Sequence, residues 1–170
     1  MLGTYAARLE LDTSLVRSAI LFIASVAYLG YIPVASGTFG SLAAIPLFWV
    51  FDAFAKTSIV VTLLAFAALV ACACWIADKA DAYLNEHDSH KIVIDEVAGY
   101  VAAILFVPLT WQTALAAFFI FRVLDVVKPF PAGYIDANLP GGAGVVLDDV
   151  VSGLYSNLLL RGLLMLGLLT

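Results

Sequence analysis

Charged side chains are scarce in this chain of 170 residues. Only 12% of the residues are Asp, Glu, Lys or Arg, whereas 64% are hydrophobic. Soluble domains carry about 25% charged and about 45–50% apolar residues. A soluble domain of this length cannot bury so much apolar surface, so lipid must cover part of it. We therefore expect an integral membrane protein with one membrane-embedded domain over residues 1–170, of which residues 1–15 form a polar N-terminal arm.

Basic residues and cysteines are also few. Eight Lys and Arg stand against 13 Asp and Glu, which gives a formal net charge of −5. Nucleic acids bind clustered basic side chains, so they are excluded as partners. The two cysteines, Cys72 and Cys74, lie two positions apart in an apolar run. That spacing does not match a CxxC redox or zinc motif, and small packing residues are the better interpretation.

Long apolar runs dominate the first half of the chain. Residues 59–77 are free of charge and at ~1.5 Å per residue cover about 29 Å, close to one hydrocarbon thickness. A shorter helix is predicted at residues 42–55, after a Gly- and Ser-rich loop at 33–46 in which Thr38 or Ser41 serves as N-cap. That helix start suits an anion site and equally an ordinary cap. Residues 18–34 fit a span, a tilted helix or an interfacial segment.

Residues 97–121 form an uncharged run that could be read as a single span. That interpretation would place Asp95 and Asp125 on opposite membrane faces. Pro108 and Trp111 instead indicate a turn at an interface. Helices at about 92–107 and 111–127 would then form a hairpin with both acidic ends on one face. The predicted fold is an all-α polytopic membrane bundle with short helices, a helical hairpin at 92–127 and a polar active-site face at one membrane surface.

Acidic residues mark the ends of these apolar segments. Ionised carboxylates at that depth are costly without a nearby positive charge, so they are functional-site candidates. The candidates are Asp95, Glu96, Asp125, Asp148 and Asp149. Asp148 and Asp149 begin the last predicted helix, which ends near residue 169. Capping of this helix would explain one acid at its start well, but it explains two less well. Hard oxygen ligands without cysteine predict Mg²⁺, or Mn²⁺, rather than zinc.

Two further groups of side chains accompany the acids. Arg122, Asp125 and Lys128 fall at i, i+3 and i+6 and so share one stripe of a helix, where the two cations suit phosphate recognition. His87 and His90 could bind metal, but histidines in a charged loop are more often solvated. Metal, carboxylates and cations together suit phosphoryl chemistry.

Four sequence motifs resemble those of the bacterial phosphatidylglycerophosphatase A family. They are S-G-T-F-G-S-L-A-A-I-P from Ser36, I-V-I-D-E-V-A-G from Ile92, F-R-V-L-D-V-V-K-P-F-P from Phe121 and L-D-D-V-V-S-G from Leu147. Each motif alone is weak, but four in this order at this spacing are specific. The resemblance runs from about Ser36 to Gly153, and the family loop begins P-G-T where this chain has Ser36-Gly37-Thr38.

The resemblance implies a magnesium-dependent inner-membrane enzyme that converts phosphatidylglycerophosphate to phosphatidylglycerol. It further implies catalytic roles for Asp95, Glu96, Asp125 and Asp149, with Asp148 as an additional metal ligand. Arg122 and Lys128 would then bind the phosphate, and Thr38 and Ser41 would line the pocket. The lipid substrate stays in the membrane, and no oligomeric state is implied.

The hydrolytic route is left open by the residues. Either a metal-activated water or an aspartate attacks phosphorus. Because the D-x-D-x-T and C-x₅-R signatures are absent, we favour water, with Asp95 or Glu96 as base. A secondary transporter or ion channel is the alternative from another class, but it predicts acids near the midplane and repeated broken helices. An alcohol phosphatidyltransferase would need D-G-x₂-A-R, which is absent.

Membrane orientation is predicted from the few basic residues. Positive residues favour the cytoplasmic side. The acidic face carries Lys79, Lys91, Arg122 and Lys128, whereas Lys56 and Arg161 lie toward the other face. We therefore expect a multi-pass protein of the bacterial inner membrane with its active site facing the cytoplasm.

Overall fold

The structure, a computed structural model, describes residues 14–86 and 89–169. All regular elements in these ranges are helices, which confirms the all-α prediction. Most of the predicted polar arm at 1–15 lies outside the described residues. A helix at Ser14–Ala24 comes first, followed by the short 3₁₀ helix η1 (Leu29–Tyr31), α2 (Ser36–Ala44), α3 (Leu47–Thr57), α4 (Ile59–Leu84), α5 (Ile94–Ile104), α6 (Trp111–Val127), α7 (Ala132–Asn138) and α8 (Gly142–Met165).

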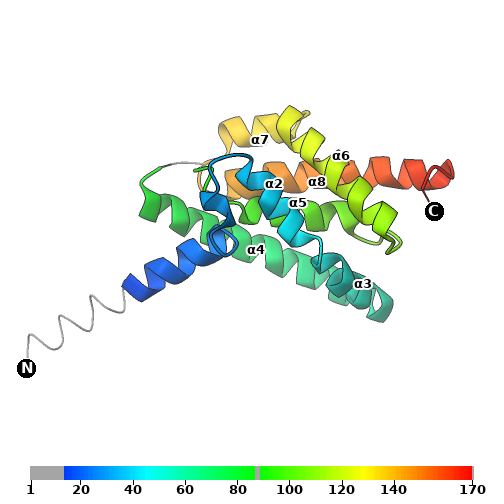
Figure 1. The fold of residues 1–170 in the computed structure, drawn as a ribbon, viewed down its shortest axis with the longest axis horizontal. Helices are drawn as coiled ribbons and strands as arrows, with labels where there is room; N and C mark the ends of the chain where they lie inside the picture. The colour runs from blue at the N-terminus through cyan, green and yellow to red at the C-terminus, as the bar shows by residue number, and fades with distance from the viewer. Residues whose placement is uncertain (1–13, 87–88, 170) are drawn as a thin grey trace, which may run out of the picture.

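Three helical stretches are long and apolar enough to cross a membrane. They are Ser36–Thr57, which joins α2 and α3, then α4 and α8. These stretches run along the long axis of the molecule (Figure 1). The first residues of α2 and α8 and the last residues of α4 and α6 lie toward one end, on the left of Figure 1. Segments far apart in the sequence thus meet at one end of the bundle.

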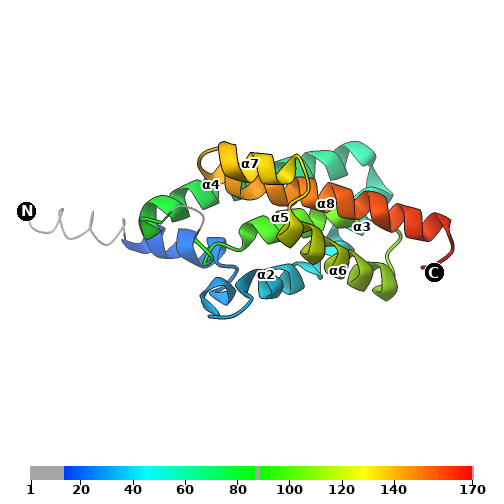
Figure 2. The ribbon, with the colours of Figure 1, turned by 90° about the horizontal axis from the view of Figure 1, so that it is seen from above.

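Helix α5 forms the centre of the bundle. Every residue of α5 except Glu96 is buried. It contacts α2, α3, α4, α6 and α8, and Figure 2 shows it between α2 on one side and α8 on the other. A helix that is apolar all round is expected in such a buried position. Its carboxylates therefore enter the site from the middle of the protein.

The predicted hairpin between residues 92 and 127 is confirmed. After α5 the chain turns back through residues 105–110, and α6 returns alongside α5. The Tyr100 hydroxyl donates to the Ala114 carbonyl oxygen at 3.1 Å and joins the two arms. Thr110 and Thr113 form a capping box that starts α6. The acids at 95–96 and 125 are thereby brought to the same end of the molecule.

The first arm of the hairpin, α5, is shorter than the predicted helix at 92–107. Side chains of α8 donate hydrogen bonds to the carbonyl oxygens at its end. The Asn157 amide donates to the carbonyl oxygens of Ala103 and Leu105, each at 2.9 Å. Arg161 donates to Leu105 at 2.9 Å and to the Asn157 side-chain oxygen at 2.8 Å. Backbone carbonyls at a helix end need such partners away from water. These side chains allow α5 to stop inside the bundle.

Small residues let α5 and α8 approach closely. A methyl group at Gly153 would overlap the Gly99 carbonyl oxygen, and one at Gly99 would meet the Phe121 ring at 2.5 Å. Close crossings of this kind are typical of helices that associate in membranes. The crossing places Asp149 of α8 beside the first turn of α5.

The predicted loop at 33–46 and helix at 42–55 are wrong in their boundaries. Helix α2 already begins at Ser36, after Ala35 in a left-handed conformation (φ 54°), and among residues 14–86 and 89–169 no side chain caps it. Thr38 and Ser41 are therefore not N-caps. The glycines belong to the helix because α5 packs against them: a methyl group at Gly40 would come within 2.9 Å of the Val93 side chain. Packing overrides the loop-like local composition here.

Three other boundaries also differ from the prediction. Helix α4 extends to Leu84, seven residues beyond the predicted span at 59–77. Helix α8 begins at Gly142 and ends at Met165. The short helix α7 was not predicted. Residues 18–34, for which the sequence allows three arrangements, contain the end of the Ser14–Ala24 helix and η1.

Candidate functional site

A polar pocket of about 420 Å³ lies where the helix ends meet. It is formed by the starts of α2, α5 and α8, the end of α6 and the segment before α5. The lining residues are Pro33, Ala35, Ser36, Gly37, Ser89, His90, Ile92, Asp95, Glu96, Arg122, Asp125, Lys128, Val145, Asp148 and Asp149. All five predicted acids and both predicted cations are therefore brought together, although they span more than fifty positions of the sequence.

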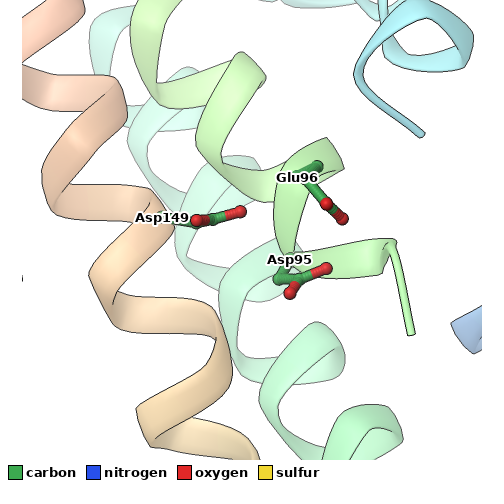
Figure 3. A group of neighbouring side chains, drawn as sticks. All are labelled: Asp95, Glu96 and Asp149. Carbon is green, nitrogen blue, oxygen red and sulfur yellow. The ribbon is translucent and has the colours of Figure 1, made fainter. Parts of the chain in front are cut away.

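Three of the acids form a tight cluster. One carboxylate oxygen from each of Asp95, Glu96 and Asp149 lies within 4.8 Å of the other two. Figure 3 shows Asp149 of α8 pointing toward the two acids in the first turn of α5. Asp95 is 9% exposed and Asp149 only 3%. This cluster, Asp95 with Glu96 and Asp149, is called the acid triad below.

The acid triad is short of positive charge. One oxygen of Glu96 and one of Asp149 are buried without a hydrogen-bond partner in the described part of the chain. The pocket lining contains five carboxylates and only two cationic side chains, so its formal charge is −3 with histidine neutral. Buried like charges at this spacing repel strongly unless a cation joins them. The site therefore fits a hard divalent cation with oxygen ligands.

Arg122 connects the triad to the neighbouring acid on α6. Its guanidinium lies 2.7 Å from the Asp125 carboxylate and 3.6 Å from that of Glu96. The Arg122 side chain is 20% exposed, so water screens these pairs only partly. Both contacts are made by one nitrogen, Nη1, so the guanidinium can still turn its other donors toward an anion in the pocket.

Lys128 follows the last residue of α6 and lies between two other acids. Its ammonium lies 2.6 Å from Asp148 and 2.9 Å from Asp136 of α7. Burial alone lowers the pKa of Lys128, but the hydrogen bonds with Asp148 and Asp136 outweigh it and raise the pKa above its ordinary value. Lys128 therefore stays cationic throughout the physiological range. The charge of Asp148 is thereby compensated by this lysine.

The structure does not place Thr38 and Ser41 in the pocket. The Ser41 hydroxyl is buried and donates to the Gly37 carbonyl oxygen at 2.9 Å. Positions one helical turn earlier, Ser36 and Gly37, line the pocket instead. The reason is the earlier start of α2, which moves residues 38 and 41 away from the open end of the helix.

Of the two histidines considered as metal ligands, the structure describes His90. His90, for which solvation was the favoured interpretation, lines the pocket, and its backbone carbonyl accepts the Ser36 hydroxyl at 2.8 Å. His87 lies outside the described residues. The sequence offered no signal that separates the two, because both occur in the same charged segment.

Capping does not explain Asp148 and Asp149. They lie in the second turn of α8, whose first turn contains no acid. Both side chains are buried, at 2% and 3% exposure. A helix dipole stabilises carboxylates mainly in the first turn. Because capping fails, a ligand or a counter-charge in the pocket is needed to stabilise these acids.

Taken together, the fold and the pocket define a helical membrane protein whose polar end can hold a cation and an anionic group side by side. Comparison with known proteins makes this class specific. The sequence profile described as "Phosphatidylglycerophosphatase A" matches residues 22–164. The chain therefore belongs to the phosphatidylglycerophosphatase A family, a family of phosphatases.

Two individual relatives bear the name of this family, and a third bears the name of another lipid phosphatase. The chain is 37% identical to a phosphatidylglycerophosphatase A of Haemophilus influenzae over 75% of this chain and 77% of the relative. It is 34% identical to that of Escherichia coli, over 75% and 73%. A putative phosphatidylinositol-3-phosphatase of Bacteroides thetaiotaomicron is 35% identical, over 77% and 84%. No solved structure matches the chain.

Proposed function

We propose that the protein removes the phosphate monoester from phosphatidylglycerophosphate and releases phosphatidylglycerol in a Mg²⁺-dependent reaction. The observation that carries this proposal is the acid triad beside Arg122 and Lys128, in one pocket of a chain that belongs to this family. Phosphate hydrolysis needs charge stabilisation and positioning above all. The pocket offers groups for both.

Mg²⁺ is the proposed cation, with Mn²⁺ as a possible substitute. Asp95, Glu96 and Asp149 would hold it, since their oxygens converge and those of Glu96 and Asp149 include atoms without hydrogen-bond partners. When bound, a divalent cation would polarise the phosphate and make a nearby water more acidic. Asp125 and Asp148 line the same pocket and are proposed as further ligands, but each already faces a cationic side chain.

Arg122 and Lys128 are proposed to bind the phosphate. Both line the pocket, and both are fixed by carboxylates on one side. Each nevertheless has more N–H donors than the ion pairs use: five on the guanidinium and three on the ammonium. The remaining donors can reach phosphate oxygens without a large side-chain movement.

Attack by water is the proposed route. The triad lies in a pocket open enough for water and a phosphate group. Asp95 or Glu96 would accept the proton from the attacking water, because they begin α5 at the pocket, whereas Asp149 lies deeper. A phosphoaspartate route would instead use one of these carboxylates as the nucleophile.

The substrate lipid would remain in the membrane during the reaction. The pocket lies at the end of the apolar spans, where a lipid phosphate group would lie if the acyl chains stayed among them. We further propose that this end faces the cytoplasm of a bacterial cell and that the membrane is the inner membrane. The family membership and the distribution of basic residues support both statements.

Phosphate release by purified protein in detergent tests the proposal. Phosphatidylglycerophosphate should be turned over with Mg²⁺, and EDTA should stop the reaction until Mg²⁺ is restored. Phosphatidylinositol 3-phosphate belongs in the same assay, because one relative bears that name. Vesicles with the protein, loaded with a radioactive cation, test the transporter alternative. Ion flux without phosphate release would overturn the proposal.

A further inference from the structure

We propose that Asp136 of α7 is a positioning residue, which holds the Lys128 ammonium at the phosphate pocket. The inference rests on the proposed function, in which Lys128 binds the substrate phosphate. Asp136 does not line the pocket, and no sequence motif pointed to it. Its carboxylate lies 2.9 Å from the Lys128 ammonium, which is thus shared between α7 and the α8 partner Asp148.

Two carboxylates from different helices hold the Lys128 ammonium. Asp148 is almost fully buried, with its side chain 3% exposed, and lies 2.6 Å from the ammonium. With Asp148 alone, a single contact would hold the ammonium, and the flexible lysine side chain could take several positions around it. Asp136 is 36% exposed and attracts the same ammonium from a more solvated position. The two forces together keep the nitrogen at the pocket edge.

Helix α7 is fixed against Lys128 by its backbone as well. A methyl group at Gly133 would come within 2.9 Å of the Lys128 carbonyl oxygen. Positions 133 and 136 are three apart, so they share one face of α7. The hydroxyl of Tyr155 on α8 donates to the Phe130 carbonyl oxygen at 3.0 Å and holds the connecting turn. Asp136 thus approaches Lys128 from a segment that is itself anchored.

Lys128 has a backbone conformation that requires support. It has φ 47° and ψ 62°, the left-handed region that ordinary side chains rarely occupy. This conformation ends α6 and turns the Lys128 side chain toward α7 and α8. Without Asp136, one of the two contacts that fix the side chain at this turn is lost.

The direction in which Asp136→Asn changes phosphate affinity distinguishes a positioning role from a purely electrostatic one. If Asp136 acted only as a negative charge near the pocket, Asp136→Asn would strengthen the binding of a phosphate dianion. If Asp136 positions Lys128, the same variant weakens phosphate binding, because the ammonium is no longer restricted to one position at the pocket and phosphate must order it. Half-exposed ion pairs contribute little, so we expect KM to rise by about two- to fivefold while kcat changes less.

A double-mutant cycle with Lys128 provides the decisive test. In a Lys128→Met background, Asp136→Asn should no longer raise KM, because its effect passes through the lysine. An Asp136 that merely supports folding would weaken activity equally in both backgrounds. If Lys128→Met does not fold with Asp148 left unpaired, Lys128→Met/Asp148→Asn serves as the background. Asp52→Asn, which breaks the pair with Lys56 at 2.6 Å on α3, is the matched control.

Binding of inorganic phosphate keeps this inference separate from the proposed function. Calorimetric titration with phosphate and Mg²⁺ should show the same two- to fivefold loss for Asp136→Asn and none in the Lys128→Met background. Failure of the wild-type protein to release lipid phosphate overturns the proposed function, and the titration then decides on Asp136 alone. Unchanged or tighter phosphate binding by Asp136→Asn overturns the positioning role.

Discussion

Gly37 of α2 lies directly against the Glu96 carboxylate of α5, so closely that a methyl group at position 37 would overlap one of its oxygens. The same methyl group would come within 3.1 Å of the Arg122 guanidinium. Glycine is thus required here by the approach of a charged side chain, since Gly37 lies inside a helix, where alanine is otherwise preferred. The packing of α2 against α5 and the position of a triad oxygen are therefore coupled.

Gly37→Ala should displace Glu96 and lower activity more than stability. The Glu96 side chain can turn away from the added methyl group, so the fold tolerates the change, but the triad loses its geometry. We expect phosphate release to fall by at least about tenfold, while the unfolding temperature in detergent stays within a few degrees. Gly162→Ala is the matched control, because nothing in the described part of the chain lies within 4 Å of its added methyl group. Equal activity of the two variants would show that the Glu96 position is unimportant.

Asp149→Asn should separate metal binding from folding. Removing one of three converging carboxylates lowers repulsion, so the metal-free variant should be at least as stable as the wild type. Mg²⁺ at a hundredfold excess over its dissociation constant stabilises a native protein by about 2.7 kcal/mol. We expect this metal-dependent rise in unfolding temperature in the wild type and not in Asp149→Asn. Asp52→Asn, an acid outside the pocket, should keep it.

The same substitution should also abolish turnover. We expect loss of phosphate release from Asp149→Asn, Asp95→Asn and Asp125→Asn, each with an intact fold by circular dichroism. Near-normal turnover in all three variants would contradict the assignment of the acids to the site.

The location of Asp95 and Asp125 at the same end of the bundle was predictable from the sequence, because only a hairpin brings them to one membrane face. The turn residues at 108–111 supported it, and the structure has α6 beginning at Trp111 as predicted. Charge at the ends of apolar runs is costly, so acids at such positions indicate a functional site from the sequence alone. All five predicted acids line one pocket for this reason.

Features that depend on packing between helices were not predictable. Gly37 and Gly40 read locally as a loop, and only the contact with α5 explains why they are helical. The early start of α8 at Gly142 was missed for a similar reason: a methyl group there would overlap the Cys74 carbonyl oxygen of α4. Asp136 belongs to no periodic pattern, because its partner Lys128 lies beyond the end of α6. Such contacts appear only in three dimensions.

Arg122→Lys should reduce catalytic efficiency although it keeps the positive charge. One guanidinium nitrogen, Nη1, faces both Asp125 and Glu96, which leaves the other two nitrogens for phosphate, whereas a lysine has a single nitrogen for all three groups. A lost hydrogen bond to a charged group costs about 1.5–3 kcal/mol, which corresponds to a roughly ten- to hundredfold fall in kcat/KM. Arg17→Lys, whose arginine donates to the Tyr83 carbonyl outside the pocket at 3.1 Å, should leave kcat/KM unchanged. Wild-type efficiency of Arg122→Lys would mean that a single positive charge is enough.

Asn157→Leu should destabilise the protein without acting on the chemistry directly. The variant leaves the carbonyl oxygens of Ala103 and Leu105 without the Asn157 amide, in a part of the bundle that water does not reach easily. Buried groups that lose their partner cost about 1–3 kcal/mol each, so we expect about 2–4 kcal/mol in SDS-induced unfolding followed by circular dichroism. Arg161 also donates to the Leu105 carbonyl oxygen, so part of this cost is offset and the expected total stays below the full sum for two unpaired groups.

Asn138→Ala is the control for Asn157→Leu, since the Asn138 amide donates to the Tyr134 carbonyl at the exposed surface of α7. That variant should unfold like the wild type. Because α5 presents two acids of the triad at its other end, the fraction of Asn157→Leu that stays folded should turn over substrate at a near wild-type rate. A folded Asn157→Leu protein with unchanged stability and no activity would instead place Asn157 in the catalytic machinery and contradict its role as the cap of α5.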